Sequence, residues 1–135
     1  MDLVVSYMDK EKTLKRIGII AAILLLVLAG YTVVQKYLPA PYVMQTVSSP
    51  NGSFTAYVFE CNGGATSGWV YNISILRSDK KLGKGNGNVY ISDIPPKSIE
   101  WLNNNELYVD DYKSINTTKQ RQSINGVKVK YRSLE

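Results

Sequence analysis

Residues 17–34, which read IGIIAAILLLVLAGYTVV, form a run of eighteen residues without a charged side chain. A helix of this length is roughly 27 Å long, which matches the apolar core of a lipid bilayer. Leucine fills positions 24–26, so apolar side chains surround the helix instead of forming one amphipathic stripe. Pro39 and Pro41 cannot continue it. We therefore expect one transmembrane helix at residues 17–38, embedded in the lipid bilayer.

The charges on either side of this run predict its orientation. Four basic residues precede it, at positions 10, 12, 15 and 16, and only Lys36 closely follows it. Positive charge is retained on the cytoplasmic side of a membrane. We expect residues 1–16 to be a cytoplasmic tail and residues 39–135 to form a domain outside the cell membrane, held by a single-pass anchor.

The apolar run also has features of a cleaved signal peptide and of a lipoprotein signal. Val27-Leu28-Ala29 has the small residues of a signal-peptide cleavage site, but the apolar run continues through Val33 and Val34, which favours retention. Leu28-Ala29-Gly30 resembles the start of a lipoprotein signal. The next residue is Tyr31, which has no thiol for lipid attachment, so lipidation is excluded.

The composition excludes several kinds of chemistry. The chain has 135 residues, no histidine and one cysteine, so imidazole-dependent sites and an intramolecular disulfide are ruled out. Residues 42–135 carry 11 basic and 8 acidic side chains. This mild positive charge favours an anionic envelope polymer or a membrane surface as a partner, and makes nucleic acid unlikely.

After the apolar run, the hydrophobic periodicity becomes that of β-strands. Alternating or β-branched stretches separated by turn residues occur at 54–59, 69–75, 89–91, 99–102, 107–109 and 123–129. Asn125-Gly126 fits a type I′ hairpin turn, and the glycine-rich residues 83–88 suggest a flexible connection. We expect a mainly β domain of six to seven strands without a helix after residue 38. Short connections favour an antiparallel meander that forms a curled sheet or a small sandwich.

Several motifs in this region occur in a recognisable order. They are Ser-Pro-Asn-Gly at 49–52, Asn-Gly-Gly-Ala-Thr at 62–66, Ile-Glu-Trp-Leu at 99–102 and Ile-Asn-Gly at 124–126. Together they resemble a family of small extracytoplasmic domains of unknown function from Gram-positive bacteria, tethered by an N-terminal membrane segment or a lipid. The resemblance covers about residues 47–128. It implies a location and a fold, and it transfers no catalytic residue.

Two segments are candidate interaction surfaces. The first is the loop formed by Asn62, Gly63, Gly64, Ala65 and Thr66, which could present backbone amides to an anion or simply be a tight connection. The second is the alternation of Lys128, Lys130 and Arg132 with apolar residues, which places three cations on one face of a strand. That face is either a docking stripe for an anionic polymer or lipid headgroups, or a solvated sheet surface.

Catalytic and metal sites are not indicated. Cys61 has no histidine and no nearby lysine or arginine in the sequence to favour its thiolate, so we interpret it as a structural or incidental thiol. Carboxylates occur at positions 60, 93, 100, 110 and 111, without the spacing of a calcium loop. Asp110 and Asp111 are adjacent in an expected strand, so they should point to opposite faces, as a solvated strand end. We expect no cofactor and no metal.

These observations favour a non-enzymatic binding or interaction domain, tethered outside the membrane, whose partner is a protein or an anionic envelope component. A protective or exclusion role is one subtype of such a domain. The alternatives are a carboxylate-based envelope hydrolase using Asp110 or Asp111, and an accessory subunit of a membrane complex that uses the helix itself as its contact.

Overall fold

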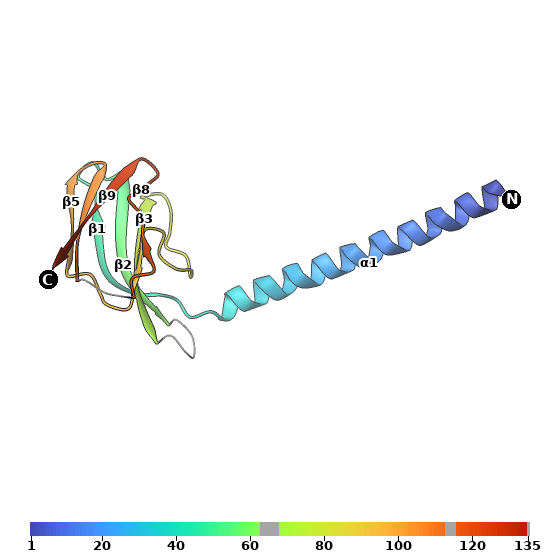
Figure 1. The fold of residues 1–135 in the computed structure, drawn as a ribbon, viewed down its shortest axis with the longest axis horizontal. Helices are drawn as coiled ribbons and strands as arrows, with labels where there is room; N and C mark the ends of the chain where they lie inside the picture. The colour runs from blue at the N-terminus through green and yellow to red at the C-terminus, as the bar shows by residue number, and fades with distance from the viewer. Residues whose placement is uncertain (63–67, 113–115, 135) are drawn as a thin grey trace. The chain divides into compact units, whose positions relative to one another are not determined.

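The computed structural model describes residues 1–62, 68–112 and 116–134. The chain divides into two compact units, Met1–Leu38 and Pro39–Glu135, and each is described by itself. The first is one helix, and the second is a β domain (Figure 1).

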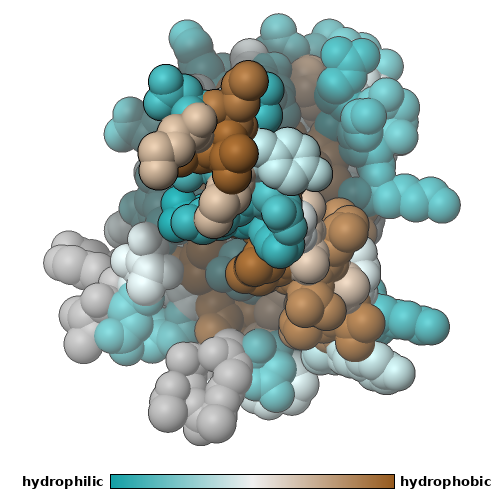
Figure 2. All heavy atoms as spheres, turned by 90° about the vertical axis from the view of Figure 1, so that its right-hand side faces the viewer, coloured by the Kyte–Doolittle hydropathy of each residue, from teal (hydrophilic) through white to brown (hydrophobic). Residues whose placement is uncertain are grey.

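Helix α1 spans Asp2–Tyr37 and is 36 residues long. None of its residues is buried. Figure 2 colours the chain by hydropathy and shows hydrophobic residues, in brown, at the surface of the view. The helix is long and apolar enough to span a membrane, a property that it shares with signal sequences. It includes the residues expected as a tail, where Glu11 and Lys15 form an exposed ion pair.

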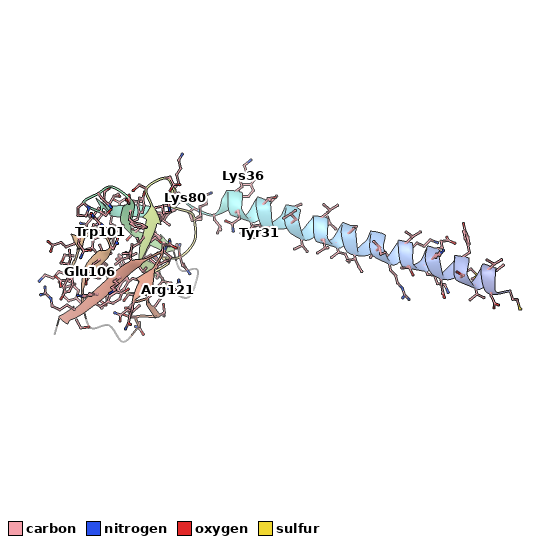
Figure 3. The ribbon with its side chains drawn as sticks, turned by 90° about the horizontal axis from the view of Figure 1, so that it is seen from above. Tyr31, Lys36, Lys80, Trp101, Glu106 and Arg121 are labelled. Atoms are coloured by element: carbon pink, nitrogen blue, oxygen red, sulfur yellow. The ribbon has the colours of Figure 1, made fainter. Side chains whose placement is uncertain are left out.

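The C-terminal end of α1 lies where the prolines predict it. Leu38 leaves the helical conformation with φ −63° and ψ 132°, and its N–H still donates to the carbonyl oxygen of Val34. An extended backbone is the conformation that a residue preceding proline favours. Tyr31 and Lys36 therefore lie on the last turns of the helix (Figure 3).

The β domain contains two sheets in the described residues. The five-stranded sheet has the order β1-β2-β3-β4-β7, and the four-stranded sheet has the order β5-β6-β9-β8. The strands are β1 (Tyr42–Ser48), β2 (Phe54–Asn62), β3 (Trp69–Arg77), β4 (Tyr90–Ser92), β5 (Ser98–Asn103), β6 (Glu106–Tyr112), β7 (Lys119–Gln120), β8 (Ser123–Ile124) and β9 (Val127–Leu134). The expectation of a mainly β domain after one helix is confirmed.

The two sheets pack face to face around one hydrophobic core. The buried side chains come from alternate positions of both sheets: Ala56, Val58, Ile73, Ile75, Val89, Tyr90, Ile99, Trp101, Leu107, Val109, Val127 and Val129. Trp101, labelled in Figure 3, also donates from its indole Nε1 to the carbonyl oxygen of Val47 at 3.0 Å. This bond links β5 to the edge strand β1, so the architecture is the sandwich among the expected alternatives.

Two parts of the strand prediction were wrong. Strands β1 and β7 were not expected, and β6 pairs with β9 in parallel, which no simple meander does. The chain leaves β6 for the other sheet, forms β7 there, and returns through the β8–β9 hairpin. This crossover brings β9 beside β6 with the same direction. The expected hairpin turn at Asn125-Gly126 is confirmed: Asn125 has φ 51° and Gly126 has φ 82°, as a type I′ turn between β8 and β9 requires.

The glycine-rich segment before β4 is packed against β3 at its end, contrary to the expected flexible connection. Gly87 is buried, and its N–H donates to Oδ1 of the fully buried Asn72 at 2.9 Å. The side chain of Asn88 accepts from the N–H of Ile75 and donates to its carbonyl oxygen, both at 2.9 Å. Because this side-chain amide takes the place of a backbone partner, it continues the β3 ladder beyond the short β4.

Candidate functional site

The outer side of the four-stranded sheet carries two columns of polar and charged side chains. We call this surface the charged sheet face. It consists of Glu106, Tyr108 and Asp110 on β6 and Lys128, Lys130 and Arg132 on β9. These residues alternate with core residues along each strand, so they share the solvent side of the sheet.

Ion pairs join the two columns. Arg132 donates from Nε to Oδ1 of Asp110 at 2.8 Å and from Nη2 to Oδ2 at 2.9 Å, so the pair is bidentate. Its guanidinium carbon lies 5.4 Å from the ring centroid of Tyr108, within cation–π range. Lys130 pairs with Glu106. The hydrogen bond between them lowers the pKa of the Glu106 carboxyl and raises the pKa of the Lys130 ammonium.

The cation stripe expected from the sequence therefore lies on one face, but most of its charge is compensated. Lys130 and Arg132 both have a carboxylate partner on the neighbouring strand. Lys128 has no ion pair within the described part of the chain, and its charge still helps to lower the pKa of Glu106. The acidic column could not be assigned to this stripe from the sequence, because the pairing depends on the parallel register of β6 and β9.

The second candidate, the loop at 62–66, is described only at Asn62, because positions 63–66 lie outside the described residues. Asn62 is exposed at the end of β2 and lies opposite Trp69 in the register with β3. Trp69 is 59% exposed, which is unusual for so large an apolar side chain. The unpredicted strand β1 adds Tyr42, which is 67% exposed. This end of the sheet is therefore rich in uncovered aromatic surface.

A polar hollow of about 310 Å³ opens beside Asp111 and is lined by Asp111, Tyr112, Thr117, Thr118, Lys119, Gln120 and Ser133. Asp111 is 1% exposed, so its interpretation as a solvated strand end was wrong. Its carboxylate accepts from the hydroxyl of Tyr90 at 2.6 Å and from Nε2 of Gln120 at 2.9 Å. Through these hydrogen bonds, the buried carboxylate of Asp111 connects β6 of one sheet to β4 and β7 of the other.

The two carboxylates of the hydrolase alternative, Asp110 and Asp111, lie on opposite sides of the four-stranded sheet. Asp110 points to the outer face, where Arg132 holds it, and Asp111 points into the interior, as the alternation predicts. A pair of carboxylates cannot act on one substrate from opposite sides of a sheet. Burial raises the pKa of the Cys61 thiol, which disfavours the nucleophilic thiolate. No group of three metal-ligating side chains occurs in the ranges that the structure describes.

Comparison with known protein families gives a match over most of the chain. A model for a family of unknown function (DUF5412) matches residues 11–123, which includes most of the helix and the β domain through the start of β8. Neither a curated protein nor a solved structure matched the chain.

Proposed function

Because this chain belongs to the DUF5412 family, whose function is unknown, we propose its role from its own surfaces. The protein is a membrane-tethered, non-enzymatic binding protein. Its β domain lies outside the cytoplasmic membrane of a Gram-positive cell and presents the charged sheet face to a protein partner. Capture of an incoming toxin or phage component, which would give a protective role, is a special case of this proposal.

Support for the tether and its orientation comes from α1. The helix has an eighteen-residue uncharged run, and the helix by itself leaves these apolar side chains exposed on all sides. A lipid bilayer would cover them. The excess of basic residues before the run supports a cytoplasmic N-terminus.

The observation that carries the choice of partner is the bidentate pair between Arg132 and Asp110, with Tyr108 under the guanidinium. Arginine and tyrosine are enriched at the energetic centres of protein interfaces. Here the arginine is held in one geometry before any partner arrives, which reduces the entropy lost on binding.

The charge pattern favours a protein partner over an anionic polymer. A polymer such as a teichoic acid responds mainly to net positive potential, which the carboxylates of Glu106 and Asp110 reduce. A protein surface can instead complement fixed columns of opposite sign. The non-enzymatic assignment is supported by the opposed directions of Asp110 and Asp111 and by the structural use of Asp111 between the sheets.

The proposal is tested by photo-crosslinking in intact cells that produce the full chain. A photoreactive amino acid replaces Glu100, which is exposed on β5 and lies opposite Tyr108 in the β-sheet register. The test variant combines Glu106→Lys with Lys130→Glu, which reverses one ion pair and preserves both the net charge and the pairing. The control reverses an exposed ion pair at the end of β3, in the other sheet, by combining Arg77→Asp with Asp79→Arg, a residue of the following turn.

We expect a discrete protein adduct in the parent chain and in the control, and loss of the adduct in the Glu106/Lys130 reversal. A partner that senses only net charge would crosslink equally to all three chains, and this result would contradict recognition of the charge pattern. The absence of any protein adduct from the parent chain would overturn the choice of the charged sheet face.

A further inference from the structure

One end of the five-stranded sheet carries aromatic side chains that the sandwich does not cover. Tyr42 of β1, Glu60 of β2 and Tyr71 of β3 lie side by side in the register, and Trp69 lies two residues before Tyr71 on β3. These residues share the face that elsewhere holds Val58 and Ile73 in the core, because side chains alternate along a strand. In Figure 1 the ends of β2 and β3 project beyond the other strands. The core face therefore continues into an uncovered aromatic surface.

Further apolar side chains gather at the same end. Val43 is 43% exposed and Met44 is 47% exposed, and both lie where a bulge interrupts the pairing of β1 with β2. Only two other large apolar side chains of the described β domain are as exposed, Leu102 and Tyr112. Tyr42 and Trp69 lie on the core side of the sheet, whereas Val43 lies opposite Phe59 and faces the other side. This end of the sheet therefore exposes apolar side chains on both faces, and we call Tyr42, Val43, Met44 and Trp69 together the aromatic end.

The covalent chain keeps the aromatic end close to α1. Residues 38–41 alone separate the last helical residue, Tyr37, from Tyr42. A fully extended chain over these five steps spans at most about 18 Å. Pro39 and Pro41 also stiffen this connection. A helix that crosses the bilayer up to Tyr37 therefore leaves Tyr42 within reach of the membrane surface.

The composition of the aromatic end matches the interface between lipid headgroups and acyl chains. Tryptophan and tyrosine concentrate at this depth because their rings are amphipathic, and valine and methionine gain from leaving water. Glu60, between the two tyrosines, would oppose deeper burial because an unpaired carboxylate is costly to desolvate. The surface is thus suited to shallow insertion.

We propose that the β domain docks onto the outer surface of the bilayer through the aromatic end, with Trp69 at the headgroup level. This inference rests on the membrane anchor of the proposed function. It adds a second, peripheral membrane contact to the helix and restricts the orientation of the domain. The charged sheet face belongs to the outer side of the other sheet, so docking leaves it accessible to a protein partner.

The experiment uses the full chain in vesicles of phosphatidylcholine and phosphatidylglycerol, with or without bromine atoms on the upper acyl chain. Trp69 and Trp101 are the two tryptophans of the chain. Trp101 is buried in the core, so it reports folding, while Trp69 reports contact with lipid. The matched variant is Trp69→Phe, which keeps Trp101 as its only tryptophan. Aqueous iodide serves as the opposite quencher.

We expect brominated lipid to reduce the emission of the parent chain, and to leave the emission of Trp69→Phe unchanged. Iodide should quench the parent less in vesicles than in detergent. If brominated lipid quenches neither chain while iodide reaches Trp69, docking is overturned. If Trp69→Phe also abolishes the protein crosslink formed by the photoreactive residue at position 100, the aromatic end contacts the protein partner instead of the membrane.

Retention of the chain in vesicles after an alkaline wash separates the two proposals. Retention without quenching refutes the docking alone, because the anchor then holds and the aromatic end stays in water. Release of the chain from the vesicles refutes the anchor, and the docking inference with it.

Discussion

Replacing Gly87 with alanine should destabilise the β domain strongly, although glycine-to-alanine changes at open positions are mild. A Cβ atom at position 87 would lie 2.5 Å from the carbonyl oxygen of Tyr90, 2.7 Å from that of Ile73 and 3.0 Å from Cβ of Asn72. Two of these neighbours are backbone atoms of paired strands, so they cannot rotate away. The loop must lift from β3 to admit the methyl group.

The size of the effect follows from what such a shift breaks. Overpacking costs about 1–3 kcal/mol. Loss of the bond from the N–H of Gly87 to the buried Asn72 adds about 1 kcal/mol or more, because Asn72 has no access to water. The lower entropy of the unfolded alanine chain offsets about 0.5 kcal/mol. We expect a net loss of about 1.5–3.5 kcal/mol in the free energy of unfolding.

The assay is urea unfolding of the full chain in detergent micelles, followed by tryptophan fluorescence. Both tryptophans lie in the β domain, so α1 does not contribute to the signal. Gly85→Ala is the matched control, since a Cβ at position 85 meets nothing within 4 Å. We expect it to change the free energy by less than about 0.5 kcal/mol. Equal losses in the two variants, or none at position 87, would refute close packing of this loop.

Three further predictions concern the buried polar groups. Asp111→Ala removes the acceptor of the Tyr90 hydroxyl and should lower the free energy of unfolding by about 3 kcal/mol in the same urea assay. A loss below about 1 kcal/mol would contradict a stabilising role for the hydrogen bonds of Asp111 between the sheets. Burial raises the pKa of Tyr90 and Tyr131, so both stay protonated in the folded state above about pH 10, where unfolded tyrosine ionises. These two tyrosines should therefore leave the free energy of unfolding unchanged below about pH 10. Above that pH, each tyrosine should lower it by about 1.4 kcal/mol per pH unit. A constant urea midpoint up to about pH 11 would refute this pH dependence. Asn88→Ala leaves the N–H and carbonyl of Ile75 without their side-chain partner and should lower the free energy of unfolding by about 2 kcal/mol. This loss should appear as a lower urea midpoint. An unchanged midpoint would show that the Asn88 side chain does not stabilise the edge of β3.

The elements that local sequence determines were the ones that could be predicted. The uncharged run at 17–34 and the prolines after it determine α1 and its end, and the Asn125-Gly126 dipeptide determines its hairpin turn. Strand β1 lacks such a signal, because six of its seven residues are exposed and its apolar residues have no clear alternation. Strand β7 has only two residues, too few for any periodicity.

The candidate surfaces depended on long-range pairing, so they could be predicted only in part. The alternation in β9 correctly placed Lys128, Lys130 and Arg132 on one face. Their carboxylate partners on β6 follow from a parallel register set by the crossover through the other sheet. In the same way, alternation predicts that Asp110 and Asp111 point to opposite faces, but it does not reveal the partners of the inner one. The hydrogen bonds that Asp111 accepts from Tyr90 and Gln120 depend on the packing of the opposite sheet.

The central claim, a β domain held outside the cell by an uncleaved helix, is tested most directly by cysteine labelling in intact cells. Lys81→Cys on the exposed surface of the β domain and Lys12→Cys before the apolar run are each made with Cys61→Ala, so each chain has one thiol. We predict that an impermeant maleimide labels position 81 in intact cells and position 12 only after permeabilisation, on a chain of full-length mass. Labelling of position 12 from outside with protection of position 81, or a chain that lacks position 12, would contradict the claim.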